Sequence, residues 1–159
     1  MFDDFKELLS IFNAQNVKYL IVGGYAVSFH AQPRATKDID ILIQPDAENA
    51  KAVYAALSIF GAPLEGLTGQ DFADRKKFFR MGSEPVMVDL LPQIDGIDFA
   101  SAWEKRVEAV VDERTGLKAF FISATDLITS KLAAGRPQDI ADVAALRGVA
   151  ERKPGGELS

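Results

Sequence analysis

Cysteine is absent from the 159-residue sequence, and histidine occurs once, at His30. Without cysteine the chain can form no disulfide, thiolate nucleophile, iron–sulfur cluster or zinc finger. A single histidine likewise excludes a multi-histidine metal site. Any metal ion must therefore be held by oxygen ligands, which is the preference of Mg²⁺, Mn²⁺ and Ca²⁺.

The sequence also has no excess of positive charge. It contains 18 Lys and Arg residues and 23 Asp and Glu residues, which gives a net charge of −5. A broad basic face that binds nucleic acid unaided is not expected. The exception is a short basic run, Arg75-Lys76-Lys77 with Arg80, which lies among phenylalanines. This run predicts either a contact with an RNA end or a solvated strand edge.

Long hydrophobic runs are missing too. The longest uncharged stretch, residues 19–33, is shorter than the roughly 20 residues of a membrane-spanning helix and includes two glycines. The first residues are acidic where a secretory signal would be basic. We therefore expect a cytoplasmic protein with no membrane segment.

The spacing of apolar residues predicts helices that alternate with strands. The expected helices span residues 3–15, 24–31, 47–60, 98–104 and 123–134, and a last helix opens at Pro137. The expected strands span residues 18–22, 38–43, 77–81, 86–91, 107–111 and 117–122, with Gly82 connecting the third and fourth. This order favours an α/β (α+β) fold, a mixed β-sheet flanked by helices, with C-terminal helices. We expect a single domain over residues 1–152 and a flexible tail over residues 153–159.

Two aspartates alternate with isoleucines in the strand expected over residues 38–43. Because successive side chains of a strand point to opposite faces, the isoleucines share the core face, and Asp38 and Asp40 share the other. The two carboxylates then lie about 7 Å apart at the backbone and can converge on one cation. Aspartate is disfavoured in strands, so the pair indicates either a metal site or an edge strand with a solvent-exposed face.

A third carboxylate, Asp89, is the lone charge in the apolar run of residues 86–91. An unpaired buried carboxylate is costly, so it must be paired, capped or bound to a metal ion. If its strand lies beside that of Asp38 and Asp40, three carboxylates converge and repel one another unless divalent cations neutralise them. Two such ions are a standard device for in-line phosphoryl transfer. The alternative is a salt bridge to a sheet arginine such as Arg80.

Gly23 and Gly24 stand between an expected strand and an expected helix. Glycine lets the backbone approach a ligand closely, and a helix N-terminus attracts phosphate. The pair has neither the Gly-Lys-Ser/Thr of a Walker loop nor the spacing of a dinucleotide fingerprint. It therefore predicts either a phosphate-binding turn or a plain strand-to-helix turn.

Two charged residues fall on apolar stripes of the last two expected helices. At about 100° per residue, Lys131 lies within the stripe of Ala124, Leu127, Ile128 and Leu132. Asp139 lies within the stripe of Ile140, Val143 and Leu146. This indicates an internal ion pair, or a lysine that contacts a ligand phosphate and is steadied by the carboxylate. The alternative is that Lys131 extends to solvent and Asp139 complements its helix N-terminus.

The motifs follow one another in the order of a glycine pair, thirteen intervening residues, Asp38-Ile39-Asp40 and a later strand aspartate. In this order of motifs the sequence resembles the nucleotidyltransferase superfamily typified by DNA polymerase beta. Within it, the stretches GGYAVSFHAQPRATKDIDILI and KLAAGRPQDIADV are similar to the small AbiEii/AbiGii toxin-type nucleotidyltransferases. The resemblance covers residues 18–43 closely, and residues 85–91 and 123–146 more loosely. It implies a nucleotidyltransferase-like fold and metal-dependent transfer of a nucleoside monophosphate from a nucleoside triphosphate to a hydroxyl, with release of pyrophosphate.

The resemblance also implies roles for individual residues. Asp38 and Asp40 would hold both divalent ions, Mg²⁺ or Mn²⁺, and Asp89 would hold the catalytic ion and help deprotonate the acceptor hydroxyl. The turn at Gly23 and Gly24 would cradle the triphosphate. The other nucleotide-binding residues that the resemblance implies are Arg34, Thr36, Lys131 and Asp139.

The acceptor that the resemblance implies is an RNA end, a protein or a small molecule, and its toxin-type members imply a toxin–antitoxin context. Family toxins are usually longer, which implies a minimal core that forms a homodimer or recruits a partner protein. A second class of function stays open, a non-catalytic nucleotide-binding or regulatory module, antitoxin-like, that retains the fold. The intact trio of Asp38, Asp40 and Asp89 favours the enzyme, because a module without the chemistry could lose these residues easily.

Overall fold

The computed structural model describes residues 1–83 and 86–152, and its elements follow the predicted alternation of helices and strands. In chain order they are α1 (Asp3–Ala14), β1 (Tyr19–Val22), α2 (Gly23–His30), β2 (Asp38–Ile43), α3 (Ala47–Phe60), the 3-10 helix η1 (Gly69–Ala73), β3 (Phe79–Ser83), β4 (Val86–Leu91), α4 (Phe99–Glu104), β5 (Val107–Asp112), β6 (Leu117–Phe121), α5 (Ala124–Ala134) and α6 (Pro137–Arg152).

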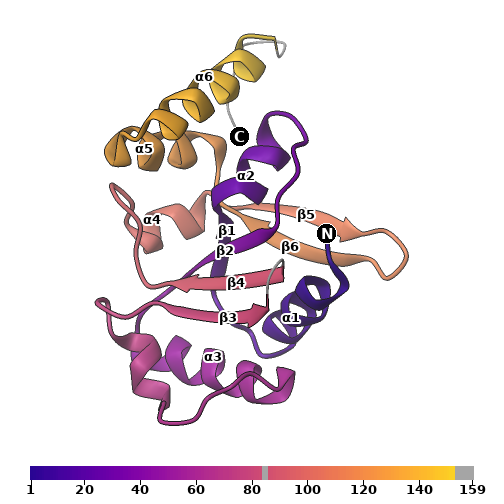
Figure 1. Ribbon diagram of the computed structural model, residues 1–159, viewed down its shortest axis with the longest axis vertical. Coiled ribbons are helices and arrows are strands. Elements are labelled where there is room, and N and C mark those ends of the chain that lie inside the picture. The colour runs from indigo at the N-terminus through magenta and orange to yellow at the C-terminus, as the bar shows by residue number, and fades with distance from the viewer. Residues whose placement is uncertain (84–85, 153–159) are drawn as a thin grey trace.

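The strands form one six-stranded sheet in the order β3-β4-β2-β1-β6-β5 (Figure 1). β2 runs parallel to β4, and β1 runs parallel to β6. The pairs β1–β2, β3–β4 and β5–β6 are antiparallel. This mixed sheet, flanked by helices, confirms the predicted fold class.

One face of the sheet packs against α1 and α3, which lie together on the same side of the strands (Figure 1). The isoleucines of β2 belong to this core, and each is at most 2% exposed. Burying an aliphatic side chain of this size contributes about 1.5–3 kcal/mol. The core partners on the two helices include Phe5, Leu8, Leu9, Phe12, Val53 and Leu57. The aspartates of β2 therefore point to the opposite face, towards the side where α2, α5 and α6 lie.

Several boundaries differ from the sequence-based expectation, and two of them matter for the site and for the connection between strands. Helix α2 begins at Gly23, with Val22 in the N-cap position, one residue before the expected start at residue 24. Strand β3 begins two residues later than expected and contains Gly82, which pairs with Met87 on β4. The connection between β3 and β4 therefore falls on residues 84–85, which lie outside the described residues, as does the tail expected over residues 153–159.

Two apolar residues assigned to core stripes are instead half exposed. Leu132 of α5 is 50% exposed and Ile140 of α6 is 59% exposed. The inward face of α6 carries Asp139 and Asp142 beside its apolar residues, so the helix is rotated relative to a purely apolar stripe. The apolar pattern of these helices is therefore a poor guide to their orientation.

None of the helices in the described residues combines the length and the apolar character needed to span a bilayer.

Candidate active site

The parallel pairing of β2 with β4 brings the three predicted carboxylates to one face of the sheet. Asp40 is the direct register partner of Asp89, and Asp38 lies two residues before Asp40 on the same strand. Paired residues of neighbouring strands and residues two apart on one strand share a face. The trio is half-buried, with side chains of Asp38 and Asp89 that are 39% and 16% exposed.

The charges of Asp38 and Asp89 act on Asp40, which lies between them. The pKa of Asp40 rises to about 6, first because burial disfavours its charged form, and then because of the neighbouring Asp89 and Asp38 charges. A hydrogen bond shared with Asp89 contributes to the same rise, and the positive charge of Lys131 opposes it. Carboxyl groups whose pKa is raised by burial and by neighbouring like charges cluster at functional sites.

Arg80 of β3 also contacts this cluster, so the salt bridge considered from the sequence is present. Arg80 is the register partner of Asp89, and its Nε lies 3.4 Å from Asp89 Oδ1. Its guanidinium also reaches Asp38, with Nη2 3.4 Å from Oδ2. The arginine and the converging carboxylates therefore coexist, and the two interpretations do not exclude each other.

As the side chains stand, no group of three or more acidic or histidine residues within the described residues is arranged to hold a metal ion. The donor chemistry nevertheless suits a hard divalent cation. Among the described residues, Asp38 Oδ1 and Asp89 Oδ1 are buried oxygens without a hydrogen-bond donor, and Asp89 Oδ1 has only the 3.4 Å ion pair with Arg80. Such oxygens are costly to bury unless a cation or a donor satisfies them.

The glycine pair lies directly against this cluster. Gly23 has φ +65°, a left-handed conformation, and a Cβ at this position would collide with the carboxylate of Asp40. A Cβ at Gly24 would lie 3.0 Å from Thr36 Cγ2 and 3.5 Å from Arg34 Nη2. The sequence therefore needs glycine at position 23 to place the N-terminus of α2 beside the aspartates.

Lys131 and Asp139 form the internal ion pair that the sequence indicates, within a larger network. Lys131 Nζ lies 3.3 Å from Asp139 Oδ1 and 3.0 Å from Asp142 Oδ2, and the lysine side chain is 12% exposed. Arg136 donates from Nε to Asp139 Oδ2 at 2.7 Å. Arg34 donates from Nη1 to Asp142 Oδ1 at 2.8 Å. Three cations thus surround two carboxylates that are almost fully buried.

The pKa values of the two carboxylates reflect this network. Hydrogen bonding from Arg136 is the main cause that lowers the pKa of Asp139 to about 2. Burial alone would raise the pKa of Asp142, but hydrogen bonds from Lys131, Gln138 and Arg34 lower it below its usual range. Both aspartates therefore stay charged at neutral pH and hold the cations in place.

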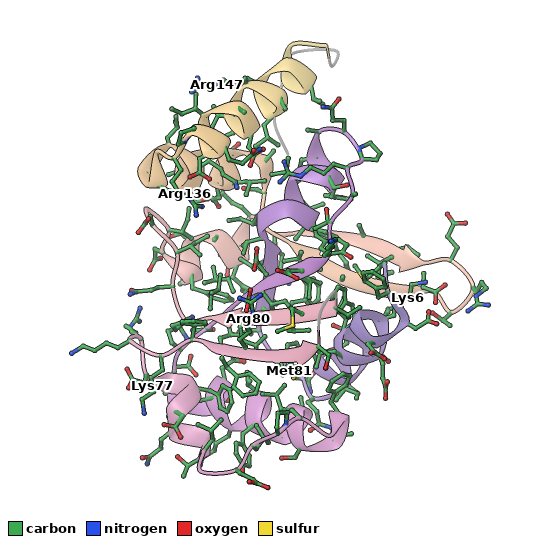
Figure 2. All side chains as sticks on the ribbon, viewed as in Figure 1. Lys6, Lys77, Arg80, Met81, Arg136 and Arg147 are labelled. Carbon is green, nitrogen blue, oxygen red and sulfur yellow. The ribbon has the colours of Figure 1, made fainter. Side chains whose placement is uncertain are left out.

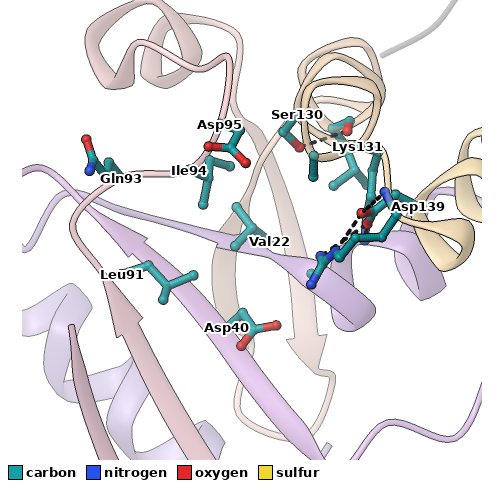
Figure 3. A pocket seen from close by; sticks show the side chains of 13 residues that line it. Val22, Asp40, Leu91, Gln93, Ile94, Asp95, Ser130, Lys131 and Asp139 are labelled. Atoms are coloured by element: carbon teal, nitrogen blue, oxygen red, sulfur yellow. Dashed lines mark hydrogen bonds and ion pairs between the residues drawn. The ribbon is translucent and has the colours of Figure 1, made fainter.

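A cavity of about 290 Å³ lies between Asp40 and this network. Figure 3 shows Asp40 and the Lys131–Asp139 pair around one space, with Asp95 across from them. Gly23, Ser130 and Arg136 also line the cavity. Arg34 and Thr36 do not line it, and instead line a neighbouring hollow with Tyr25 and Ser28. Of the predicted site residues, Gly23, Asp40, Lys131 and Asp139 therefore line this cavity. Asp38 and Asp89 lie beside Asp40 on the sheet but outside the lining, and Arg34 and Thr36 lie in the neighbouring hollow.

Sequence reasoning missed Asp142 and Arg136. Asp142 follows Asp139 by three residues, a spacing that places both on one helix face, and this signal could have identified it. Arg136 immediately precedes Pro137, where the sequence suggests only the start of a helix. Its contact with Asp139 depends on how the chain enters α6.

Residues 1–151 match the family described as "Nucleotidyltransferase of unknown function (DUF6036)". No curated protein matches the sequence.

Several solved structures share the fold at low sequence identity. One is the lincosamide antibiotic adenylyltransferase LnuA with lincomycin bound, at 18% identity and a TM-score of 0.59, covering 94% of this chain and 98% of that chain. Another is ANT(2")-Ia in complex with adenylyl-2"-tobramycin, at 16% identity and a TM-score of 0.58, covering 95% and 88%. A third is an antigenic nucleotidyltransferase-like protein from Paracoccidioides brasiliensis, at 15% identity and a TM-score of 0.54, covering 92% and 73%.

Proposed function

The chain belongs to the DUF6036 family of nucleotidyltransferases, and we propose that it transfers a nucleoside monophosphate from a nucleoside triphosphate to a hydroxyl acceptor in a metal-dependent reaction. The observation that carries this proposal is the register of Asp40 with Asp89, beside Asp38 and against Gly23. In the transfer, a bond forms between the acceptor oxygen and the α-phosphorus. The bond from the α-phosphorus to the bridging oxygen breaks, and pyrophosphate leaves.

In this proposal Asp38, Asp40 and Asp89 hold Mg²⁺ or Mn²⁺. When bound, the ions supply charge neutralisation for the triphosphate and the attacking oxygen. Asp89 helps to take up the proton of the acceptor hydroxyl, which is the role that the resemblance to the nucleotidyltransferase superfamily implies for it. Catalysis then rests mainly on positioning and on electrostatic stabilisation.

The triphosphate binds between the N-terminus of α2 and Lys131. Backbone N–H groups at Gly23 and Gly24 donate to phosphate oxygens, because a helix N-terminus carries a partial positive charge. An ammonium has three donors, so Lys131 can pair with Asp139 and Asp142 and still donate to a phosphate. Arg34 and Thr36 support the loop that leads to Asp38 and contact the nucleotide from the adjoining hollow.

The acceptor is a small molecule, an RNA end or a protein. A small molecule is favoured by the likeness to LnuA and ANT(2")-Ia, whose structures hold lincomycin and adenylyl-tobramycin, and by the 98% of the LnuA chain that is covered. A toxin–antitoxin context, closeness to AbiEii, and a homodimer or partner protein stay predictions. We take residues 1–152 to be one catalytic unit.

The test is transfer of label from each α-³²P-labelled nucleoside triphosphate in the presence of Mg²⁺ and cell extract. We expect one triphosphate to label one class of acceptor, and we expect Asp38→Asn, Asp40→Asn and Asp89→Asn to abolish the transfer. Transfer by these variants at the wild-type rate would refute the site.

The same protein also tests the non-catalytic alternative. If no triphosphate donates label, but Mn²⁺ with a triphosphate raises the melting temperature, the chain is a nucleotide-binding module. Absence of both label transfer and thermal shift would reject nucleotide binding altogether.

A further inference from the structure

Arg80 contacts two of the carboxylates that are proposed to bind the metal ions, Asp38 and Asp89. Arg80 is on β3, at the edge of the sheet, and its side chain crosses β4 to reach Asp38 on β2. It contacts Asp89 on the way, so a single guanidinium touches two of the three proposed metal ligands. Figure 2 shows Arg80 over the sheet.

Arginine suits this position for a geometric reason. The planar fork presents Nε to one carboxylate and Nη2 to another at the same time, which the point charge of lysine cannot do. The register pairing with Asp89 fixes the start of the side chain, because paired residues of antiparallel strands have their Cβ atoms about 5 Å apart. Arg80 therefore neutralises the same two carboxylates that an ion shared by Asp38 and Asp89 would require.

The contacts of Arg80 with Asp38 and Asp89 are longer than the carboxylate contacts of Arg34 and Arg136. Its distances to these two carboxylates are 3.4 Å each, whereas Arg34 and Arg136 reach theirs at 2.8 Å and 2.7 Å. Tight charge-assisted bonds are about 2.7–2.9 Å long. The Arg80 side chain is also 46% exposed, so water can replace its contacts. At this length and exposure, the contacts of Arg80 with Asp38 and Asp89 are open to replacement by another cation.

We infer that Arg80 is a displaceable internal cation, a positioning residue that balances Asp38 and Asp89 in the nucleotide-free enzyme and competes with the first divalent ion for them. This inference rests on the proposed function, since it concerns the same carboxylates. Competition lowers metal affinity without nucleotide, because the ion must displace a resident positive charge. The nucleotide relieves this by supplying phosphate oxygens as further ligands, so metal and triphosphate bind together.

The experiment measures Mn²⁺ binding directly, by the electron paramagnetic resonance signal of the free ion, without nucleotide. The variants are Arg80→Gln, which removes the charge, and Arg80→Lys, which keeps it without the fork. The matched control is Arg114→Gln in the turn after β5, where the side chain is 86% exposed and 4.0 Å from Asp112. This control makes the same change in net charge far from the cluster.

We expect Arg80→Gln to bind Mn²⁺ about ten-fold more tightly than the wild type, Arg80→Lys to fall between them, and Arg114→Gln to match the wild type. An arginine that only stabilises the sheet would lower the melting temperature of Arg80→Gln without raising its Mn²⁺ affinity. That result, or an unchanged affinity, overturns the inference. Should Arg80→Gln fail to fold, an Arg80→Lys affinity equal to that of the wild type overturns it.

The outcomes separate this inference from the proposed function. If the wild type binds Mn²⁺ with a triphosphate and Arg80→Gln binds the ion no more tightly, the inference alone fails. If neither protein binds Mn²⁺ with or without a triphosphate, the metal-dependent function and the inference fail together.

Discussion

Replacement of Asp40 by asparagine should stabilise the metal-free protein at alkaline pH. The pKa of Asp40 is about 6 in the folded protein and 3.8 as the ordinary value, so the folded state binds this proton more tightly. The stability that this carboxyl contributes is therefore fully present below pH 4 and is lost as the pH rises through 6. At about 1.4 kcal/mol for each pKa unit, the loss above pH 7 reaches about 3 kcal/mol.

Asparagine at position 40 stays neutral at every pH and can donate from its amide to Asp89, as the protonated carboxyl does. We expect Asp40→Asn to exceed the wild type by up to about 3 kcal/mol at pH 8, and to match it near pH 4. For a chain of this length, this corresponds to a rise in melting temperature of about 6–12 °C. The assay is thermal or urea unfolding across pH 4–8 in the presence of EDTA.

The matched control is Glu113→Gln, which removes one charge from an exposed turn residue and should change stability by less than about 0.5 kcal/mol at either pH. An Asp40→Asn protein that is less stable than the wild type at pH 8 would refute the reasoning. A gain of the same size at pH 4 and pH 8 would show that the effect is not electrostatic.

Three further predictions concern the surroundings of the carboxylates. Gly23→Ala should cost at least about 1–2 kcal/mol in urea unfolding, since it strains a left-handed residue and crowds Asp40; unchanged stability contradicts this. Lys131→Met should cost up to about 3 kcal/mol, because Asp139 and Asp142 lose a cation while both arginines remain; a neutral effect would mean that the lysine is dispensable. Asp139, with its pKa lowered to about 2, contributes stability above pH 4 that is lost as the pH falls through 2, so Asp139→Asn should weaken the acid sensitivity of unfolding; an identical acid transition would oppose this.

The sequence was sufficient to predict the strand that carries Asp38 and Asp40, because alternation with isoleucine is a local signal with one physical solution. The pairing of Asp40 with Asp89 could not be predicted from a local signal. The strands of these two residues are separated by α3, η1 and β3, and their register depends on how those elements pack. From the sequence we could predict that the three carboxylates converge if the strand of Asp89 pairs with the strand of Asp38 and Asp40. That pairing could be seen only in the folded structure.

The last two helices show where a helical wheel fails. It assumes that apolar residues face inward, and it therefore assigned Leu132 and Ile140 to the core. In α6 the buried positions include two aspartates, since Lys131, Arg34 and Arg136 compensate their charge. A compensated carboxylate can face inward where an apolar stripe would not place it, so the partner must be known before the orientation can be predicted.

A crystal structure with Mn²⁺ and a non-hydrolysable nucleoside triphosphate tests the central claim most directly. The account predicts anomalous density for Mn²⁺ between the carboxylates of Asp38, Asp40 and Asp89, with the triphosphate running from Gly23 towards Lys131. Mn²⁺ bound elsewhere, or a triphosphate seated away from the glycine pair, would contradict it.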